Sequence, residues 1–386
     1  MPVAIPTPAP TQLPTRTRYV FLTDIVTPYM AAVQAALAEL VDLTVVFCSR
    51  TGTRGADWAF ADGLGFRHEI IEGLTVRRRS PDATDYYLSP RIFGTLWRLR
   101  PQVVICAGYS IPTLYAAQYA ALTGAGLVIH SDGTAFSERA LNPVQRAARK
   151  ILLGRRPSCV ANSRLAAERF SELGVAPERL FLAPHSTRLT DLWDVASRRR
   201  IGEPGELRVL SVGRLIARKG LDHLVRAVAA AAQDEPGITL RLVGSGPEEG
   251  RLRALADDLG APVEFAGFVD QPGLPAQYAD ADVFAFPTLD DPFGLVLLEA
   301  AAAGVPLLAS QHGGATTDLV VDGRNGFVCE PTDEARWTKH LVRLAHDPLL
   351  RMRLGRAAHE ATLERTPERA ARGYVAAGTS ALEAAA

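Results

Sequence analysis

The sequence predicts an α/β protein made of two Rossmann-like, doubly wound domains. Short apolar runs rich in β-branched residues alternate with helical stretches from Arg18 onward, as in parallel sheets covered by helices on both faces. The chain of 386 residues is too long for one small core and suits two domains of ordinary size. A polar stretch with Gly and Pro, residues 197–206, separates two such series and is typical of an inter-domain linker.

The first domain is expected over residues 18–196. Its strands are predicted at YVFLTDIV, LTVVFCS, VVICAG, LVIHS and SCVANS, and its helices at AAVQAALAEL and TLYAAQYAAL. Residues 1–17 are rich in proline and are expected to form a disordered leader.

The second domain is expected over residues 207–365. Its strands are predicted at LRVLSVG, LRLVGSG, VEFAGFV, DVFAFPT, PLLASQ and GFVCE, with helices at GLDHLVRAVAAAA and GRLRALADDL. The tail from Glu334 is helical by composition. Its end, residues 366–386, is Ala-rich and is expected to form a separate C-terminal helix.

Composition excludes several classes of partner. Basic and acidic side chains balance, 42 against 42, which argues against nucleic acid. No apolar run approaches the roughly 20 residues that cross a bilayer, and the N-terminus lacks the features of a signal peptide. Four cysteines lie in or beside short apolar runs without metal-ligand spacing, and are predicted to be buried thiols: Cys48, Cys106, Cys159 and Cys329. A cytoplasmic protein is therefore expected.

The most informative segment is residues 287–331, in which two acids flank the start of an apolar helix. A Pro-Phe-Gly turn follows Asp291, so the backbone N–H groups of Phe293, Gly294, Leu295 and Val296 are expected to be free for an anion such as a diphosphate. Glu299 lies further along this helix, where its carboxylate can accept hydrogen bonds from ribose hydroxyls. Together these features predict a site for a nucleotide sugar.

This segment resembles the donor-site signature of retaining glycosyltransferases of family 4, which have the GT-B fold. The resemblance implies two facing Rossmann-like domains, a donor and acceptor cleft between them, and a C-terminal helix that crosses back to the first domain. Family members usually have Glu at both acidic positions, whereas this chain has the shorter Asp291 at the first. The resemblance implies that Asp291 binds the hydroxyls of the transferred sugar.

Two cations are expected to bind the diphosphate of the donor. The run VGRLIARKG follows a predicted strand, and Gly213 allows close backbone approach while Arg214 and Lys219 carry positive charge. Such cations stabilise the charge that develops on a departing phosphate. Gly246, in the next glycine turn, and Val269, in the segment that resembles the base-binding strand end, are further donor-site candidates.

No metal or other cofactor is expected. Asp280-Ala281-Asp282 has the Asp-x-Asp pattern that binds a divalent metal in another glycosyltransferase fold. Here the pattern is predicted to end a helix and lead directly into a strand, and the cations named above make a metal unnecessary.

The first domain is expected to bind the acceptor. LVIHSDG ends a strand in His130 and Asp132, and alignment on the following glycine puts Asp132 where family members commonly have His. Asp132 could orient or deprotonate the acceptor hydroxyl. The turn Thr27-Pro28-Tyr29 replaces the Gly-Gly pair of many relatives, so Tyr29, with Asp24, is expected to shape the acceptor pocket.

Basic side chains, some of them beside aromatic ones, suggest peripheral contact with the inner face of a membrane, although such charges are usually only solvated. They are Arg77, Arg78, Arg79, Arg98, Arg100, Arg146, Arg149, Lys150, Arg155 and Arg156, with Tyr86, Tyr87 and Trp97.

The predicted function is transfer of a sugar, as in a hexosyltransferase, from a UDP- or GDP-sugar to a hydroxyl with retention at the anomeric carbon. A glycan, a lipid-linked sugar or a small molecule could be the acceptor, and the oligomeric state stays open. Two alternatives remain: a nucleotide-sugar 2-epimerase of the same fold, and a catalytically inactive nucleotide-sugar-binding partner subunit.

Overall fold

The computed structural model describes residues 16–49, 64–76, 86–139, 141–186, 189–199 and 202–385. These residues form two compact units. Unit 1 comprises the chain up to Arg188 together with Arg365–Ala386, and unit 2 comprises Leu189–Glu364. The predicted leader lies almost wholly outside the described residues.

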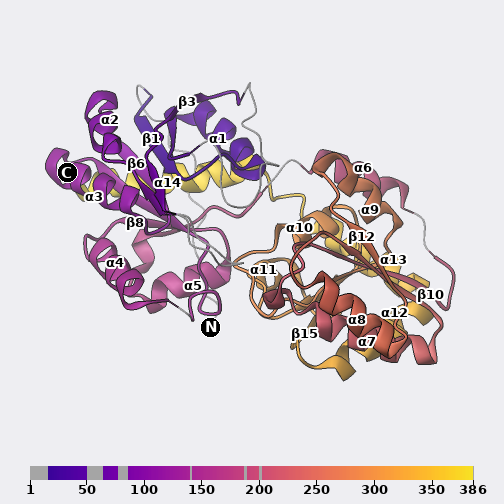
Figure 1. The fold of residues 1–386 in the computed structure, drawn as a ribbon. Coiled ribbons are helices and arrows are strands. Elements are labelled where there is room, and N and C mark those ends of the chain that lie inside the picture. Colours follow the sequence, from indigo (N-terminus) through magenta and orange to yellow (C-terminus); the bar gives the residue numbers. More distant parts are fainter. Residues whose placement is uncertain are drawn as a thin grey trace. The chain divides into compact units, whose positions relative to one another are not determined.

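Unit 1 contains a parallel sheet of seven strands in the order β3-β2-β1-β6-β7-β8-β9. Figure 1 labels β3, β1, β6 and β8 of this sheet. The strands are β1 (Arg18–Thr23), β2 (Asp42–Phe47), β3 (Arg67–Ile70), β6 (Val103–Ala107), β7 (Gly126–Ser131), β8 (Ser158–Ala161) and β9 (Leu180–Leu182). A small antiparallel pair, β4 (Leu74–Val76) and β5 (Tyr86–Leu88), adjoins it in sequence. The short strands β3, β4, β5 and β9 were not predicted.

Helices cover both faces of this sheet because alternate strand residues are apolar on both sides. Tyr19 and Phe21 face α1 and α14, and Val20 and Leu22 face α2 and α3. The helices of unit 1 are α1 (Pro28–Leu40), α2 (Arg91–Leu99), α3 (Ile111–Thr123), α4 (Pro143–Leu153), α5 (Arg164–Glu172) and α14 (Pro367–Ala385).

The C-terminal helix α14 packs in unit 1, the domain to which the resemblance assigned it (yellow in Figure 1). Its small residues allow this close packing. A Cβ on Gly378 would lie 2.2 Å from the Tyr19 hydroxyl oxygen, and one on Gly373 would lie 2.2 Å from the Leu182 carbonyl oxygen. The scarcity of large apolar residues in α14 therefore follows from its proximity to the sheet.

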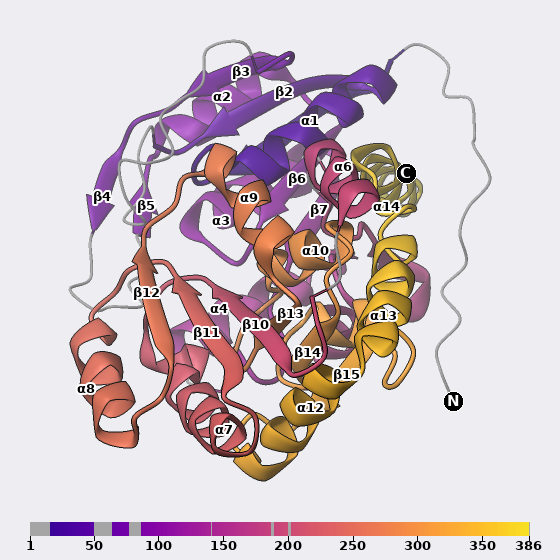
Figure 2. The ribbon, with the colours of Figure 1, turned by 90° about the vertical axis from the view of Figure 1, so that its right-hand side faces the viewer.

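Unit 2 contains a parallel sheet of six strands in the order β12-β11-β10-β13-β14-β15 (Figure 2). The strands are β10 (Glu206–Val212), β11 (Gly237–Val243), β12 (Val263–Gly267), β13 (Val283–Phe286), β14 (Leu307–Ser310) and β15 (Gly326–Cys329). The helices are α6 (Thr190–Arg198), α7 (Leu221–Asp234), α8 (Glu249–Leu259), α9 (Leu274–Asp280), α10 (Leu295–Ala302), α11 (Thr316–Leu319), α12 (Glu334–His346) and α13 (Pro348–Glu360).

Two apolar clusters form the core of unit 2, one on each face of its sheet. Val209 belongs to the cluster with α7, α8 and α12, whereas its neighbour Leu210 belongs to the cluster with α6, α9 and α10. The two parallel, doubly wound sheets confirm the predicted fold class.

The linker lies earlier than predicted. The chain passes from unit 1 to unit 2 between Arg188 and Leu189, not within residues 197–206. The reason is the packing of α6, whose Leu192 and Trp193 join the apolar cluster beneath α9 and α10. The polar, Arg-rich end of α6 was therefore mistaken for the start of an inter-domain linker.

Candidate functional site

The main group of predicted site residues lies where the strand order of unit 2 reverses. The first strand, β10, lies between β11 and β13, so successive crossovers run in opposite directions on its two sides. Ligands of open α/β sheets bind at the carboxyl ends of the strands at such a switch point. The loops that follow β10 and β13 contain Arg214, Lys219 and Asp291.

Hydrogen bonds join these two loops directly. Arg218 Nη1 donates to Asp290 O at 2.9 Å, and Leu289 N donates to Arg218 O at 2.9 Å. Gly220 has φ 61°, and a Cβ there would lie 2.3 Å from Pro287 O. Arg218 was missed as a site residue, although the run VGRLIARKG contains it. Its role is to hold the β10 loop on the β13 loop.

Lys219 and Asp291 form an ion pair across these loops. Their side chains are mostly shielded from water, with 17% and 12% of their surfaces exposed. The Lys219 ammonium also lies over the Phe286 ring, 5.7 Å from its centroid. The structure therefore brings together the cation and the acid that the sequence placed in separate motifs.

The start of α10 differs in one respect from the prediction. Phe293 N–H was expected to be free, but it donates to Asp291 Oδ1 at 3.2 Å, because the Asp side chain turns back over the following residues. Leu297 N donates to Gly294 O at 2.9 Å. Among the described residues, the N–H groups of Gly294, Leu295 and Val296 have no hydrogen-bond acceptor. Three donors thus remain at the positive end of this helix.

Gly294 is required at this helix start. Its φ is 91°, and a Cβ would lie 2.4 Å from Phe286 Cζ. On the neighbouring loop, a Cβ at Gly313 would lie 2.5 Å from Cε1 of the same ring. The ring under Lys219 is therefore held between two glycines, which fixes the floor of the site.

Glu299 is buried on α10 with 7% of its surface exposed. Tyr278 Oη donates to its Oε2 at 2.8 Å, and Gln271 Nε2 lies 3.4 Å from its Oε1. Burial raises the pKa of the carboxyl group, and the hydrogen bonds from Tyr278 and Gln271 oppose that shift. Tyr278 and Gln271 were not predicted, because α9 and the turn before it meet α10 only in the folded chain.

The remaining donor-site candidates occupy the adjoining strand ends. Gly213, with φ 150°, donates its N–H to Val243 O at 2.9 Å, and Arg214 is exposed. A Cβ on Gly246 would lie 2.3 Å from Leu215 O, so this glycine brings the β11 loop against the β10 loop. Val269 is half-buried against the apolar cluster that contains Phe293.

Arg214 and Lys219 line one small pocket with Gly213 and Phe286. Its volume is about 10 Å³, which suits a single water-sized group. Both predicted cations therefore border the same space at the end of β10.

The Asp-x-Asp segment ends a helix and leads into a strand, as its context predicted. Helix α9 ends at Asp280 and strand β13 begins at Val283. Asp282 is buried and accepts bonds from the backbone N and the Nε of Arg208, both at 2.9 Å. Within the part of the chain that the structure describes, no group of three or more His, Cys, Asp or Glu side chains is placed to hold a metal ion.

A second polar group lies at the carboxyl ends of the strands of unit 1. His130, near the end of β7, is buried, and neither ring nitrogen has a hydrogen-bond partner among the described residues. The same holds for the side-chain amide of Asn162, after β8, and the hydroxyl of Ser186, after β9. Buried polar atoms without partners mark places where a ligand or water binds. Asn162 and Ser186 were not predicted as site residues.

Aromatic rings surround His130. Tyr374 of α14 lies 5.6 Å from it and His185 lies 6.4 Å from it, measured between ring centroids. Burial lowers the pKa of His130, against the opposing effect of Asp132, and burial lowers the pKa of His185 to about 3. Both rings are thus neutral near pH 7, which suits hydroxyl groups better than anions.

The other predicted acceptor residues lie beside this cluster or at the ends of the same strands. Tyr29 stacks edge-on against His185 at 5.4 Å between centroids, and Asp132 is exposed just after β7. Asp24 follows β1, and its carbonyl accepts from Cys48 N and Ser49 N, each at 3.0 Å. Thr27-Pro28-Tyr29 does not form a loop as predicted. Instead Thr27 precedes α1 and Pro28 begins it, since proline suits the first helical position.

Several of the basic residues are paired within the protein. Arg98 pairs with Glu69, and Arg149 pairs with the buried Glu138 at 2.7 Å, which also binds Arg169 at 2.8 Å. Arg155 and Arg156 are exposed, and Arg77, Arg78 and Arg79 lie outside the described residues.

Of the helices described, none has both the length and the apolar character needed to cross a membrane. The four cysteines are free and buried, as predicted.

A match to a protein-family model covers most of unit 2. Residues 196–361 match the family model described as glycosyl transferases group 1. The chain is 37% identical over 176 residues to the GDP-mannose-dependent alpha-(1-6)-phosphatidylinositol monomannoside mannosyltransferase of Mycolicibacterium smegmatis, covering 43% of this chain and 46% of that protein. It is 35% identical over 203 residues to the D-inositol 3-phosphate glycosyltransferase of Pseudarthrobacter chlorophenolicus, covering 50% and 48%. The chain thus spans about half the length of these relatives.

Solved structures extend the likeness of fold to nearly the whole chain. Anabaena Alr3699/HepE in complex with UDP and glucose matches with a TM-score of 0.71 at 18% identity, covering 93% of this chain and 98% of that one. Sucrose-phosphate synthase from Thermosynechococcus elongatus matches with a TM-score of 0.67 at 19% identity, covering 94% and 97%. At these identities the likeness establishes the GT-B fold alone.

Proposed function

We propose that this protein is a glycosyltransferase that moves a sugar from a nucleoside diphosphate sugar to an acceptor hydroxyl. The observation that carries the proposal is the position of the Lys219–Asp291 pair at the start of α10, with Glu299 on the same helix. The group 1 match over residues 196–361 covers all of these residues.

In the proposed reaction, the bond between the anomeric carbon and the β-phosphate oxygen breaks while the acceptor oxygen bonds to that carbon. Negative charge then develops on the leaving diphosphate. Lys219, Arg214 and the free N–H groups at the start of α10 stabilise this charge. The acceptor proton passes to the departing phosphate or to Asp132.

The other site residues position the donor. Glu299 accepts hydrogen bonds from the ribose hydroxyls, and Tyr278 and Gln271 orient its carboxylate. Asp291 binds hydroxyls of the transferred sugar, and Val269 lies beside the base. Retention at the anomeric carbon and independence of a metal are part of the proposal, and both rest on the resemblance to retaining family 4 enzymes.

The donor is proposed to be a UDP- or GDP-sugar. HepE is solved with UDP and glucose, and the mycobacterial relative depends on GDP-mannose by name. The acceptor is proposed to be a glycan, a lipid-linked sugar or a small hydroxyl compound that binds at the His130 cluster of unit 1. We place the reaction in the cytoplasm, with the enzyme either free or peripheral at the membrane.

Proton NMR of the reaction tests this proposal. UDP-glucose and GDP-mannose are incubated with the protein and a panel of sugar and inositol acceptors. The expected product is a glycoside with the same anomeric configuration as the donor, assigned from its one-bond C1–H1 coupling. An inverted product would overturn retention, and an altered free sugar without transfer would indicate an epimerase. Donor binding without turnover across the panel would indicate a non-catalytic partner subunit.

A further inference from the structure

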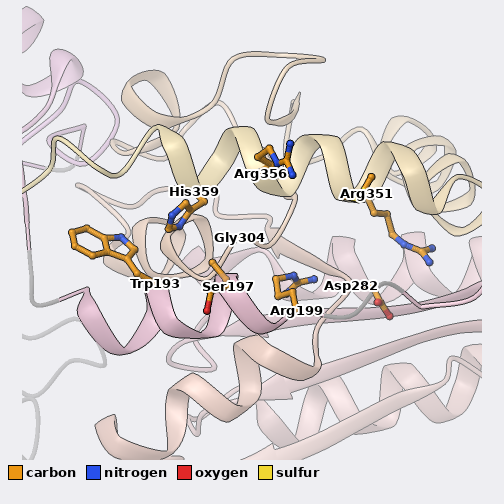
Figure 3. A pocket seen from close by; sticks show the side chains of 10 residues that line it. Trp193, Ser197, Arg199, Asp282, Gly304, Arg351, Arg356 and His359 are labelled. Carbon is orange, nitrogen blue, oxygen red and sulfur yellow. The ribbon is translucent and has the colours of Figure 1, made fainter.

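A second cavity in unit 2 lies outside the donor site, between α6 and α13 (Figure 3). Its volume is about 350 Å³. In the close view, Arg351, Arg356 and His359 come from α13, and Trp193 and Arg199 come from α6 and the residue that follows it. Asp282 lies at one end. None of these residues has a role in the proposed transfer reaction.

Positive charge exceeds negative charge in this cavity. Of the described residues that line it, Asp282 is acidic, and its carboxylate is already bound to Arg208. Arg199 donates to the carbonyl oxygens of Tyr278 at 3.0 Å and Ala281 at 2.7 Å. Carbonyl groups satisfy hydrogen bonds but do not cancel a full charge. Burial accordingly lowers the pKa of Arg199 to about 10.

Arg351 adds a second buried guanidinium. It is 3% exposed, and its Nη1 donates to Leu344 O at 2.8 Å and to Glu206 O at 3.0 Å. Its Nη2 donates to Gly202 O at 2.5 Å and to Glu203 O at 3.2 Å, so both Nη groups are bonded to backbone carbonyls. Its Nε is buried without a hydrogen-bond partner among the described residues. A buried, unpaired donor on a cation is costly unless something binds it.

Arg356 supplies an uncommitted cation at the rim. Its side chain is exposed, and it makes no hydrogen bond or ion pair with the part of the chain that the structure describes. The guanidinium group has a planar fork of donors that matches the oxygens of a phosphoryl group. Arg199, Arg351 and Arg356 line the cavity with one carboxylate, Asp282, which is already paired, so a dianion fits the charge better than a monoanion.

We propose that this cavity binds a small phosphate monoester, with the phosphoryl group hydrogen-bonded to Arg356 in the positive field of Arg199 and Arg351, and with the organic part against Trp193. The cavity is larger than inorganic phosphate alone would need, and the Trp193 indole provides an apolar wall. The site is separate from the donor site and does not depend on the proposed function.

The location of the cavity gives such a ligand a structural effect. Helix α6 begins just after the chain enters unit 2, and α13 ends just before the chain leaves it. Trp193 Nε1 donates to Thr362 Oγ1 at 3.2 Å, which already ties these two chain segments together. A bound phosphate monoester would strengthen the same link.

Isothermal titration calorimetry of the full chain with glycerol 3-phosphate and with inorganic phosphate tests this proposal. The parent protein is expected to bind glycerol 3-phosphate saturably, and inorganic phosphate more weakly. Arg356→Gln should weaken glycerol 3-phosphate binding at least about tenfold, since it removes a charge-assisted contact. Arg353→Gln, an exposed position on the same helix, should leave it unchanged.

Lys219→Gln separates the two sites, because the donor site could also bind a phosphate. Under the proposal this variant binds glycerol 3-phosphate like the parent. Loss of binding in Lys219→Gln, equal binding in Arg356→Gln and Arg353→Gln, or no saturable binding by the parent would each overturn the second site.

Discussion

The ammonium group of Lys219 and the carboxylate of Asp291 form an ion pair that joins the β10 loop to the loop after β13. Each group neutralises the charge of the other. A donor diphosphate would share Lys219, and the sugar hydroxyls would share Asp291, so the pair keeps two binding groups in place before the donor arrives. Such preorganisation reduces the cost of ordering side chains on binding.

Lys219→Gln is expected to weaken binding of a nucleoside diphosphate by about 10- to 100-fold, because a charged hydrogen bond to phosphate is worth about 1.5–3 kcal/mol. Lys339→Gln, at an exposed position on α12, is the matched control and should bind like the parent. Calorimetric titration gives both affinities. An unchanged affinity in Lys219→Gln would remove this residue from the site.

Replacement of the Glu299 carboxylate should leave the folded chain as stable or make it more stable, but should weaken donor binding. The pKa of Glu299 is raised by burial, so at neutral pH the ionised carboxylate is less favourable in the folded chain than in the unfolded one. Glu299→Gln should therefore unfold in urea at the same or a higher midpoint. Its affinity for a nucleoside diphosphate should fall by about 1–3 kcal/mol. Glu383→Gln, exposed on α14, serves as control. A destabilised variant with unchanged affinity would assign Glu299 a purely structural role.

Gly294→Ala tests the geometry of the helix start. The φ of 91° and the 2.4 Å approach to Phe286 Cζ predict a loss of about 1–3 kcal/mol in the free energy of unfolding, with weaker donor binding. The comparison is Gly250→Ala in α8, where a Cβ would meet nothing within 4 Å. That substitution should stabilise the chain by about 0.5–1 kcal/mol. Equal stabilities of the two variants would contradict the strained turn.

The stability of the protein should fall as the pH drops below about 6.5, the usual pKa of histidine. The pKa of His185 is lowered by burial to about 3, so below pH 6.5 the unfolded chain takes up a proton that the folded chain does not. The contribution of neutral His185 to the free energy of unfolding is fully present above pH 6.5. About 2 kcal/mol of it is lost by pH 5. Urea unfolding from pH 8 to pH 5 measures it.

In His185→Asn, the free energy of unfolding should fall less between pH 8 and pH 5 than in the parent. This holds even if the substitution changes the stability at pH 8. Parallel pH profiles for the parent and His185→Asn would show that His185 titrates normally in the folded chain.

Much of unit 2 could be predicted because its signals are local. The strand, glycine and cation of VGRLIARKG and the Pro-Phe-Gly turn before α10 lie within single short segments, and the structure forms them as expected. The pairing of Lys219 with Asp291, and of Glu299 with Tyr278, joins residues far apart in sequence. The spacing of residues in the sequence could not predict these contacts, because they depend on how separate loops pack.

In unit 1 the sequence indicated the strands β1, β2, β6, β7 and β8, but it gave no sign of Asn162 and Ser186. Asn162 and Ser186 are common polar residues after strands, and only the sheet order brings them beside His130. The boundary of unit 2 was misplaced for a related reason. Trp193 and Leu192 join the core of unit 2 through tertiary contacts, whereas the local composition after them is that of a linker.

Thermal unfolding in EDTA with a panel of nucleoside diphosphates and their sugars shows whether unit 2 binds a donor without a metal. A ligand at 100 times its dissociation constant stabilises the folded state by about 2.7 kcal/mol. A donor site at Lys219 and α10 should give a selective upward shift in Tm with one base, UDP or GDP, that persists without metal. No shift with any of these ligands, or a shift only after Mg²⁺ is restored, would contradict a metal-free donor site at Lys219 and α10.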